Sequence, residues 1–133
     1  MAEDIRNLVP KSKHDHEAAN AAVAAGYPAV EPILPELLEW LQDMNWPVAK
    51  SLAPFLASVG EPLIPHLKRI FESEDVIWKA WIISEIIEEN PELATVFRDY
   101  LESLAYNRPN DEDDEWLIEH ARDVLEKYGW SSR

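Results

Sequence analysis

Two tryptophans, Trp46 and Trp78, stand at matching places in two similar stretches of the chain and are well suited to binding chemistry. An indole offers a large apolar face and one N–H donor, and tryptophan is enriched among the residues that anchor a partner protein. The same side chain can instead close the helical hairpin that carries it, and both roles are open here. With nearby polar residues the two tryptophans form a candidate binding set: Asp43, Asn45, Trp46, Lys50, Trp78, Lys79 and Glu85.

Acidic residues give the chain a formal net charge of −14 and are concentrated in its second half. The stretch from Glu85 to Glu115 contains eleven acidic residues and only two basic ones, Arg98 and Arg108. Nucleic acids and anionic membranes are disfavoured as partners, because contacts to phosphate need a surface of lysine and arginine. The acids indicate either a solvated face or a docking surface that steers a basic protein. The expected steering element is an acidic loop of five residues: Asp111, Glu112, Asp113, Asp114 and Glu115.

The sequence offers little for catalysis. The patterns GxSxG, HExxH and GxGxxG and the P-loop do not occur in it. Pairs of carboxylates carry little information among 26 acidic residues, because a glycosidase needs two of them fixed across a cleft with one pKa raised by burial. We therefore predict that the protein is not an enzyme. The alternative is a small enzyme that uses carboxylates in a groove between helical repeats.

No metal site and no cofactor are predicted. The chain contains no cysteine, which removes thiolate ligands and disulfides from consideration. His14, Asp15 and His16 are consecutive, but neighbours on a helix point to different faces and cannot easily chelate one ion. A capped and solvated start of a helix is the better interpretation of this cluster. His66 and His120 stand alone in the sequence.

Signals for the ends of helices divide the chain. Ser12 and Asp15 resemble a capping box before an alanine-rich helix over about 13–25, which Gly26 ends. Asn45 is expected to cap a later helix that has Pro47 in its first turn. Pro54 lies in the middle of that helix and should kink it, and Gly60 is expected to end it. A further helix is expected from Asn90 to Tyr106, and no strand pattern of useful length occurs.

The segments 34–56 and 64–87 repeat one apolar pattern with a period near 30 residues. Stacked helical hairpins produce such a period, because a single hairpin cannot bury its own apolar face. The sequence therefore predicts an all-α, right-handed stack of about three HEAT-like or armadillo-like hairpins, at roughly 31–59, 61–89 and 90–129. An N-terminal cap helix over roughly 13–25 precedes them in a single domain, 1–133. The matched pairs are Pro35 and Pro65, Leu37 and Leu67, Trp40 and Ile70, Leu41 and Phe71, Ala49 and Ala80, Leu52 and Ile83, Phe55 and Ile86, and Leu56 and Ile87.

Three motifs resemble those of a small bacterial family of unknown function. They are an LxPKxKxD opening from Leu8 to Asp15, an LLEWLQDxNWPVA centre from Leu37 to Ala49, and DxxWKxWI from Asp75 to Ile82. At the C-terminal end the family's P-T-x-E element is replaced by Pro109, Asn110 and the acidic run. The resemblance implies a HEAT-like or armadillo-like fold and no characterised activity. In size and acidity the chain is similar to immunity proteins that neutralise bacterial toxins, which is an analogy of fold and composition.

These observations predict a protein-binding module, either immunity-type or an adaptor, that captures a basic protein partner. The opening residues lack the apolar region of a signal peptide, and no apolar run approaches the roughly 20 residues of a membrane span. A cytoplasmic location is therefore the expectation. A short stack of hairpins also leaves two apolar ends to cover, so a homodimer is possible.

Overall fold

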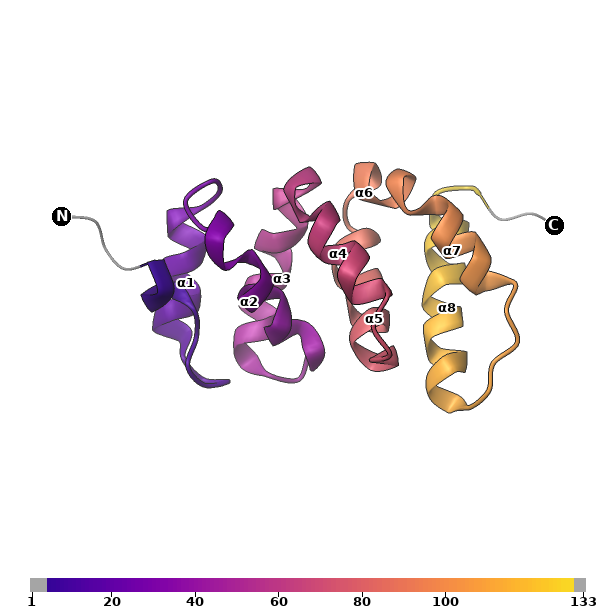
Figure 1. Cartoon of the computed structure of the whole chain (residues 1–133), viewed down its shortest axis with the longest axis horizontal. Coiled ribbons are helices and arrows are strands. Elements are labelled where there is room, and N and C mark those ends of the chain that lie inside the picture. The colour runs from indigo at the N-terminus through magenta and orange to yellow at the C-terminus, as the bar shows by residue number, and fades with distance from the viewer. Residues whose placement is uncertain (1–4, 131–133) are drawn as a thin grey trace.

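The computed structural model describes residues 5–130, and within this range the chain is helical and contains no strand. The helices follow one another along the long axis of the molecule, from α1 at one end to α8 at the other (Figure 1). The principal helices are α1 (His16–Ala25), α2 (Leu34–Glu39), α3 (Pro47–Val59), α4 (Ile64–Phe71), α5 (Val76–Ile82), α6 (Pro91–Val96), α7 (Arg98–Ala105) and α8 (Glu112–Lys127). Short helical turns extend or connect them: η1 (Ile5–Leu8), η2 (Glu31–Ile33), η3 (Trp40–Gln42), η4 (Glu61–Leu63) and the π-helical η5 (Ile83–Ile87).

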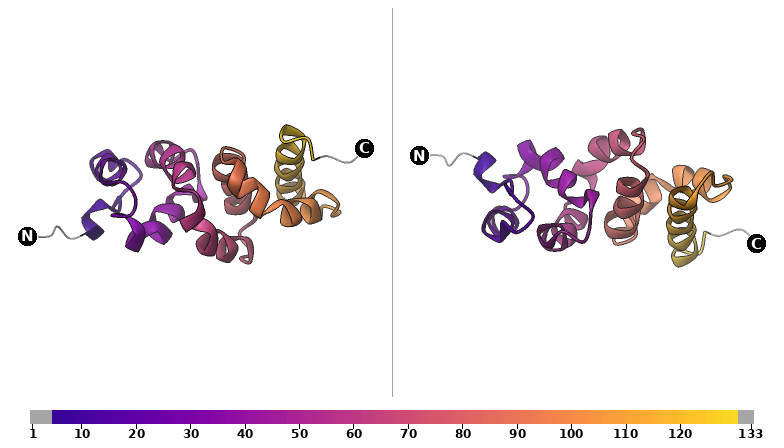
Figure 2. Two further views of the ribbon diagram at one scale, coloured as in Figure 1. Left: turned by 90° about the horizontal axis from the view of Figure 1, so that it is seen from above. Right: turned by 90° about the horizontal axis from the view of Figure 1, so that it is seen from below.

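The helices form two rows. In the views from above and below, α1, α3, α5 and α8 lie in one row, and α2, α4 and α7 lie in the other (Figure 2). Neighbours in the first row pack directly, since α1 contacts α3, α3 contacts η5, and η5 and α5 contact α8. The helical layout confirms the predicted all-α class for the described residues. Residues 1–4 and 131–133 of the predicted domain lie outside the described residues.

One continuous apolar core fills the space between the rows. Leu37 and Leu67 from the second row and Leu52 and Ile83 from the first row are fully buried in it. Among the described residues no polar or charged residue is buried, so the core is purely apolar and polar chemistry is confined to the surface.

Helix ends follow local signals, with two corrections. Gly26 and Gly60 end α1 and α3 with positive φ angles of 72° and 76°, as the sequence predicts. Ser12 does not cap α1, because the Asp15 carboxylate accepts the hydrogen bond from the Ala18 backbone N–H. Asn45 was expected to cap α3, and that prediction is wrong. Trp46 holds the cap position with φ −69° and ψ 129°, since a residue before proline is forced into an extended conformation.

Two predicted segments have a different form, and one helix changes its form toward its end. The helix expected from Asn90 to Tyr106 is interrupted at Phe97, whose side chain is buried against Phe71 with ring centroids 5.1 Å apart. The last turns of the helix that begins with α5 widen into the π-helix η5. The acidic loop is largely helical, because Glu112–Glu115 form the first turn of α8, where the helix dipole favours negative charge.

Candidate functional site

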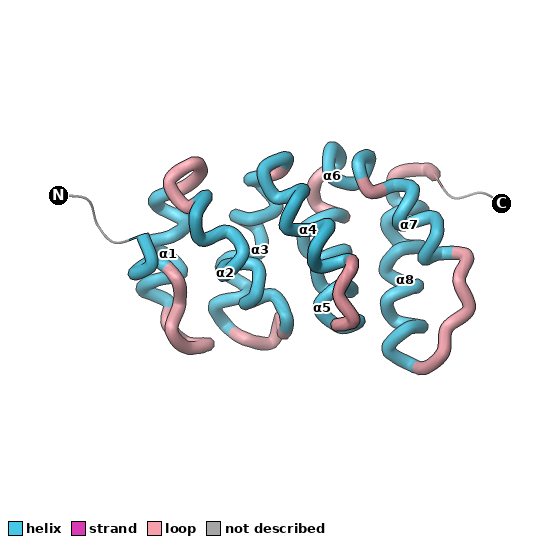
Figure 3. The backbone as a smooth tube through the Cα atoms, in the orientation of Figure 1, coloured by secondary structure: helices cyan, strands magenta, loops and turns pink. Residues whose placement is uncertain are grey.

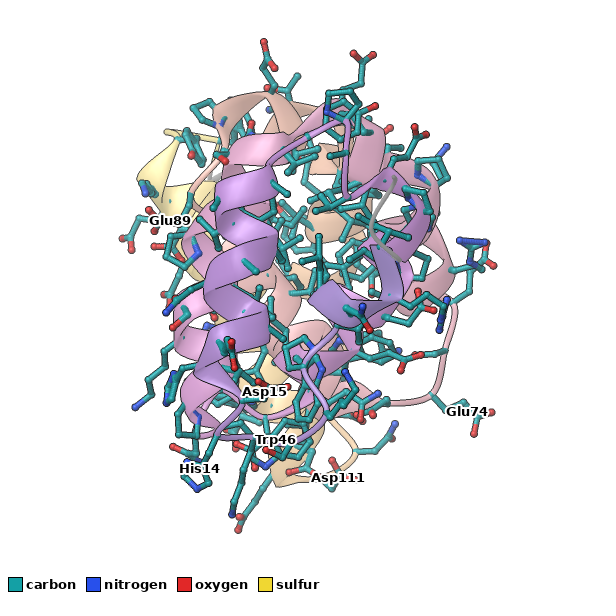
Figure 4. The ribbon with its side chains drawn as sticks, turned by 90° about the vertical axis from the view of Figure 1, so that its left-hand side faces the viewer. His14, Asp15, Trp46, Glu74, Glu89 and Asp111 are labelled. Carbon is teal, nitrogen blue, oxygen red and sulfur yellow. The ribbon has the colours of Figure 1, made fainter. Side chains whose placement is uncertain are left out.

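The helices α1, α3, α5 and α8 all begin at the same edge of the molecule, which the loops before them form (Figure 3). We call this the hairpin-tip edge and define it by Asp15, Trp46, Glu74, Asp75 and Asp111. Figure 4 shows four of these residues along one end of the molecule, with Glu89 displaced toward the opposite end. Three of the caps are carboxylates that accept backbone N–H groups, with Ala18, Trp78 and Asp114 as donors. Part of the acidity of this edge therefore comes from carboxylates that cap helices.

The first part of the candidate set lies at the start of α3. Oδ1 of Asp43 accepts a hydrogen bond of 2.8 Å from the backbone N–H of Asn45, which forms a tight turn. Asn45 and Lys50 are exposed, whereas Trp46 is half-buried. Asp43 thus has a local structural role, and the side chains that remain available at this point are Asn45, Trp46 and Lys50.

Trp46 lines a surface depression of about 300 Å³ together with Trp40. The two indoles meet edge to face, with centroids 5.4 Å apart and an angle of 75° between their planes. Two carboxylates, Glu36 and Glu39, and the apolar residues Val9 and Pro10 complete much of the wall. We call this the Trp46 depression.

Trp78 lines a smaller depression of about 190 Å³ between α2 and α4. Its indole Nε1 donates a hydrogen bond of 3.1 Å to the Leu38 carbonyl oxygen, so its one polar group is already used inside the protein. Arg69 lies on the rim with its Nη2 2.6 Å from Nδ1 of His66. Burial, together with the positive charge of Arg69, lowers the pKa of His66 below its ordinary value. Neutral His66 can then accept the hydrogen bond from Arg69.

Glu85 belongs to a third and larger depression of about 660 Å³, between the C-terminal half of α3, η5 and the start of α6. We call it the acidic groove. Its polar lining includes Glu85, Glu89 and Glu92, and no lysine, arginine or histidine lines it. The Glu85 carboxylate accepts a hydrogen bond of 3.3 Å from the Ser84 hydroxyl. Segments of π-helix are often found at functional sites, and Ser84 and Glu85 lie within one.

The predicted steering residues divide into two groups. Asp111 caps α8 by accepting a hydrogen bond of 2.8 Å from the Asp114 backbone N–H, and Asp114 accepts one of 3.1 Å from Asn110. These two carboxylates are engaged in holding the helix start. Glu112, Asp113 and Glu115 are exposed and remain available to act over a distance.

The candidate residues do not converge on one site. Trp46 and Trp78 occupy different depressions, although both depressions include Glu39 in their walls and therefore adjoin. Lys79 is half-buried on α5 and lines neither of them, and Glu85 lies in the separate acidic groove. Sequence reasoning missed Glu39, Trp40, Glu89 and Glu92. Glu89 and Glu92 flank the Asn90–Pro91 cap signal, and that junction between two helices could have indicated them.

Comparison with known proteins gives a family but no activity. A model for a domain of unknown function, DUF5071, matches residues 8–125. The chain belongs to this family. No curated protein matches the sequence. Membership in DUF5071 agrees with the resemblance to a family of unknown function, and the matched range contains the three depressions and the start of α8.

Two further findings concern the described range of this DUF5071 chain. Within residues 5–130 no helix combines the length and the apolar character that crossing a membrane would require. In the same range no three His, Asp or Glu side chains come together in a way that could hold a metal ion. Of the histidines, His66 bonds to Arg69, and His120 packs against Trp116 with ring centroids 4.8 Å apart.

Proposed function

We propose that this protein is a non-enzymatic binding module that captures a basic partner protein in its acidic groove. The observation that carries the proposal is the lining of this 660 Å³ depression, where Glu85, Glu89 and Glu92 are present without any basic residue. A concave surface of one charge sign concentrates its field and attracts ligands of the opposite sign. The complementary ligand is a segment rich in lysine or arginine.

The three groove carboxylates are available for such a partner. The ion pairs formed within residues 5–130 join Arg6 to Glu36 and Arg98 to Glu102, and neither involves a groove residue. The exposed acids at the start of α8, Glu112, Asp113 and Glu115, add to the same field and would accelerate association. An immunity-type protein or an adaptor that covers a basic surface would have these properties.

The exposure of the carboxylates favours binding over catalysis. Glu85 is half-buried, and Glu89 and Glu92 are exposed. A general acid of a glycosidase needs an apolar environment that raises its pKa, and the described residues include no buried acidic side chain. The alternative, a small enzyme that uses carboxylates in an inter-repeat groove, lacks this support.

We also propose that the hairpins are HEAT-like repeats stacked with a right-handed sense. Three of the pairs set by the sequence period have equivalent burial, since Ala49 and Ala80, Leu52 and Ile83, and Leu56 and Ile87 are all 0% exposed. In two other pairs, Trp40 with Ile70 and Phe55 with Ile86, the first residue is only half-buried and the second is buried. The pairs also lie in the same row, on α3 and on α5 with η5. Helical-repeat proteins present extended binding surfaces on such rows, and the acidic groove lies where two neighbouring units meet.

Affinity capture with matched variants tests the proposed groove. The immobilised protein is exposed to extract of its source organism at low salt, and proteins eluted by a salt gradient are identified by mass spectrometry. We expect one dominant basic protein. The triple variant Glu85→Gln, Glu89→Gln and Glu92→Gln should lose it, since each charged contact removed from a partly desolvated site weakens binding.

The control variant Glu17→Gln, Glu74→Gln and Glu126→Gln removes the same number of charges from exposed positions outside the groove. It should retain the partner with a modest reduction in association rate. Equal loss of the partner in both triple variants would show that net charge alone causes the interaction. It would exclude the groove as the binding site. An empty capture by the unaltered protein would also contradict the proposal.

A further inference from the structure

We infer that the Trp46 depression is a receptor for an alkylammonium cation, formed by the corner between the Trp40 and Trp46 indoles. The acidic groove lies elsewhere, between α3, η5 and α6, and shares no lining residue with this depression. The inference therefore goes beyond the proposed function and does not depend on it. The ammonium group could belong to a lysine side chain of a protein or to a free quaternary amine.

The geometry of the indoles is the first argument. Their planes are inclined by 75° with centroids 5.4 Å apart, so the edge of one ring packs on the face of the other and the two planes form a corner. Both rings are half-buried and packed against the core, which fixes their orientation. The face of an aromatic ring carries partial negative charge and attracts a cation within about 6 Å of the centroid, and tryptophan does this best.

The second argument is the charge around the corner. Glu36 and Glu39 line the same depression. Oε2 of Glu36 already binds Nη2 of Arg6 at 2.7 Å, so this rim holds a cation from the protein itself. Glu39 is exposed and forms no ion pair with a described residue. A second cation would therefore find one unneutralised carboxylate beside two aromatic faces, whereas an anion would meet repulsion.

The third argument is the apolar part of the wall. Val9 and Pro10 lie in the same depression as the indoles and can contact methyl or methylene groups next to a cationic nitrogen. An alkylammonium presents such groups, and a bare inorganic cation does not. The volume of about 300 Å³ lies at the lower limit of ligand pockets. A small head group or a single side chain is the ligand that fits these features.

Indole N–H signals in two-dimensional NMR provide the test. Titrations use tetramethylammonium chloride, the lysine model N-acetyl-lysine-methylamide, and the neutral isostere tert-butanol, with sodium chloride at matched ionic strength as reference. We expect saturable shifts of the Trp40 and Trp46 signals with both cations and none with tert-butanol. Assignment follows from Trp46→Phe, which removes one signal while it keeps an aromatic face.

Variants separate the contributions. Trp46→Leu removes one face and should weaken alkylammonium binding about tenfold or more. Glu39→Gln should weaken it severalfold, and because this side chain is exposed the variant keeps the inference testable if Trp46→Leu does not fold. Glu74→Gln, on the hairpin-tip edge, and the triple groove variant should leave the titration unchanged.

The outcomes are distinct. Tighter binding of tetramethylammonium than of the lysine model assigns the site to free quaternary amines, and the reverse order assigns it to lysine side chains of proteins. Equal shifts with tert-butanol would show that the depression binds apolar groups whatever their charge, and would overturn the inference. Shifts that fail to saturate, or that persist unchanged in both Trp46→Leu and Glu39→Gln, would overturn it as well.

Discussion

The indole Nε1 of Trp78 donates a hydrogen bond of 3.1 Å to the backbone carbonyl oxygen of Leu38, 40 positions earlier in the chain. The bond joins α5 to the C-terminal part of α2, so it connects two helices that are distant in the sequence. Leu38 is fully buried and Trp78 is half-buried beside it. Trp78 therefore contributes to the packing of α5 against α2, which gives it a structural role whether or not a partner also contacts its ring.

Substitution of Trp78 by phenylalanine should lower the free energy of unfolding by about 1–2 kcal/mol, because the Leu38 carbonyl loses a donor while an aromatic ring is retained. Trp78→Ala should cost about 3–5 kcal/mol, since it also leaves a cavity between α2 and α5. Urea denaturation measures both values. Trp46→Phe is the matched control, because the Trp46 indole N–H has no hydrogen-bond partner among the described residues. If Trp46→Phe and Trp78→Phe were equally destabilised, the bond would contribute nothing measurable.

Asn90 combines two functions at the junction between η5 and α6. Its Oδ1 accepts hydrogen bonds from the backbone N–H groups of Glu92 and Leu93, at 3.0 and 3.2 Å. Its Nδ2 donates a bond of 2.8 Å to the Ala57 carbonyl oxygen near the end of α3. The side chain thus caps one helix and ties it to the preceding hairpin.

Asn90→Ala should therefore destabilise the protein more than the loss of a simple cap. We expect about 2–3 kcal/mol, from a cap worth about 1 kcal/mol and a carbonyl partner worth about as much again. Asp75→Ala is the control, because Asp75 caps α5 through Trp78 N–H alone, and it should cost about 1 kcal/mol. Equal midpoints in thermal unfolding of the two variants would show that the bond to Ala57 is unimportant.

The sequence predicted the helical class and most helix ends, because these depend on local signals. Gly26, Gly60 and the Asn90–Pro91 pair act within a few residues, and the structure places helix ends at all of them. Asn45 failed as a cap because Pro47 decides the conformation of the residue before it, which moves the cap to Trp46. The interruption lies at Phe97, whose ring contacts Phe71, 26 positions away, and no local pattern contains such a contact.

The candidate sites were harder to predict for the same reason. Trp46 was recognised from its place in the repeat, but its ring contact with Trp40 depends on how the turn between them folds. Glu39 was missed because it reads as one more solvated acid on α2, and only the arrangement of hairpins puts it in the walls of two depressions. The apolar pattern predicts that residues such as Leu52 and Ile83 are buried, whereas the depressions depend on how the helices pack together.

Two residues at the C-terminal end of α8, Lys127 and Tyr128, stabilise the end of η5. The Tyr128 hydroxyl donates a hydrogen bond of 2.6 Å to the Glu88 carbonyl oxygen, and Nζ of Lys127 donates one of 3.1 Å to the same atom. A carbonyl at the end of a helix lacks an intrahelical partner and needs one from outside. Tyr128→Phe should lower the free energy of unfolding by about 1 kcal/mol, as measured in urea. Because the ring still stacks on Trp130 with centroids 5.2 Å apart, a loss several times larger would mean that repacking, and not the hydroxyl, sets the effect.

Asp15 should make stability depend on pH at the acid end. Its carboxylate accepts backbone hydrogen bonds from Lys11 at 3.0 Å and Ala18 at 3.2 Å, and these bonds lower its pKa below the ordinary value of 3.8. A group with a lowered pKa in the folded state contributes stability that is present above its unfolded pKa and is lost as pH falls through the folded pKa. The stabilisation by Asp15 should thus be complete at neutral pH, begin to decline near the unfolded pKa of about 4, and be lost as the pH falls through the lowered folded pKa.

The comparison with Asp15→Asn measures this contribution. The difference in free energy of unfolding between the two proteins should be constant from pH 5 to pH 7, as expected well above a carboxyl pKa of about 4, and should shrink at lower pH. Carboxyl NMR signals of Asp15 should report a midpoint below 3.8. The lowered midpoint should persist in about 1 M salt, because its main causes are short hydrogen bonds and not charges at a distance. A midpoint that returned to 3.8 in salt would assign the lowered pKa to the charges of Lys11 and His16 instead.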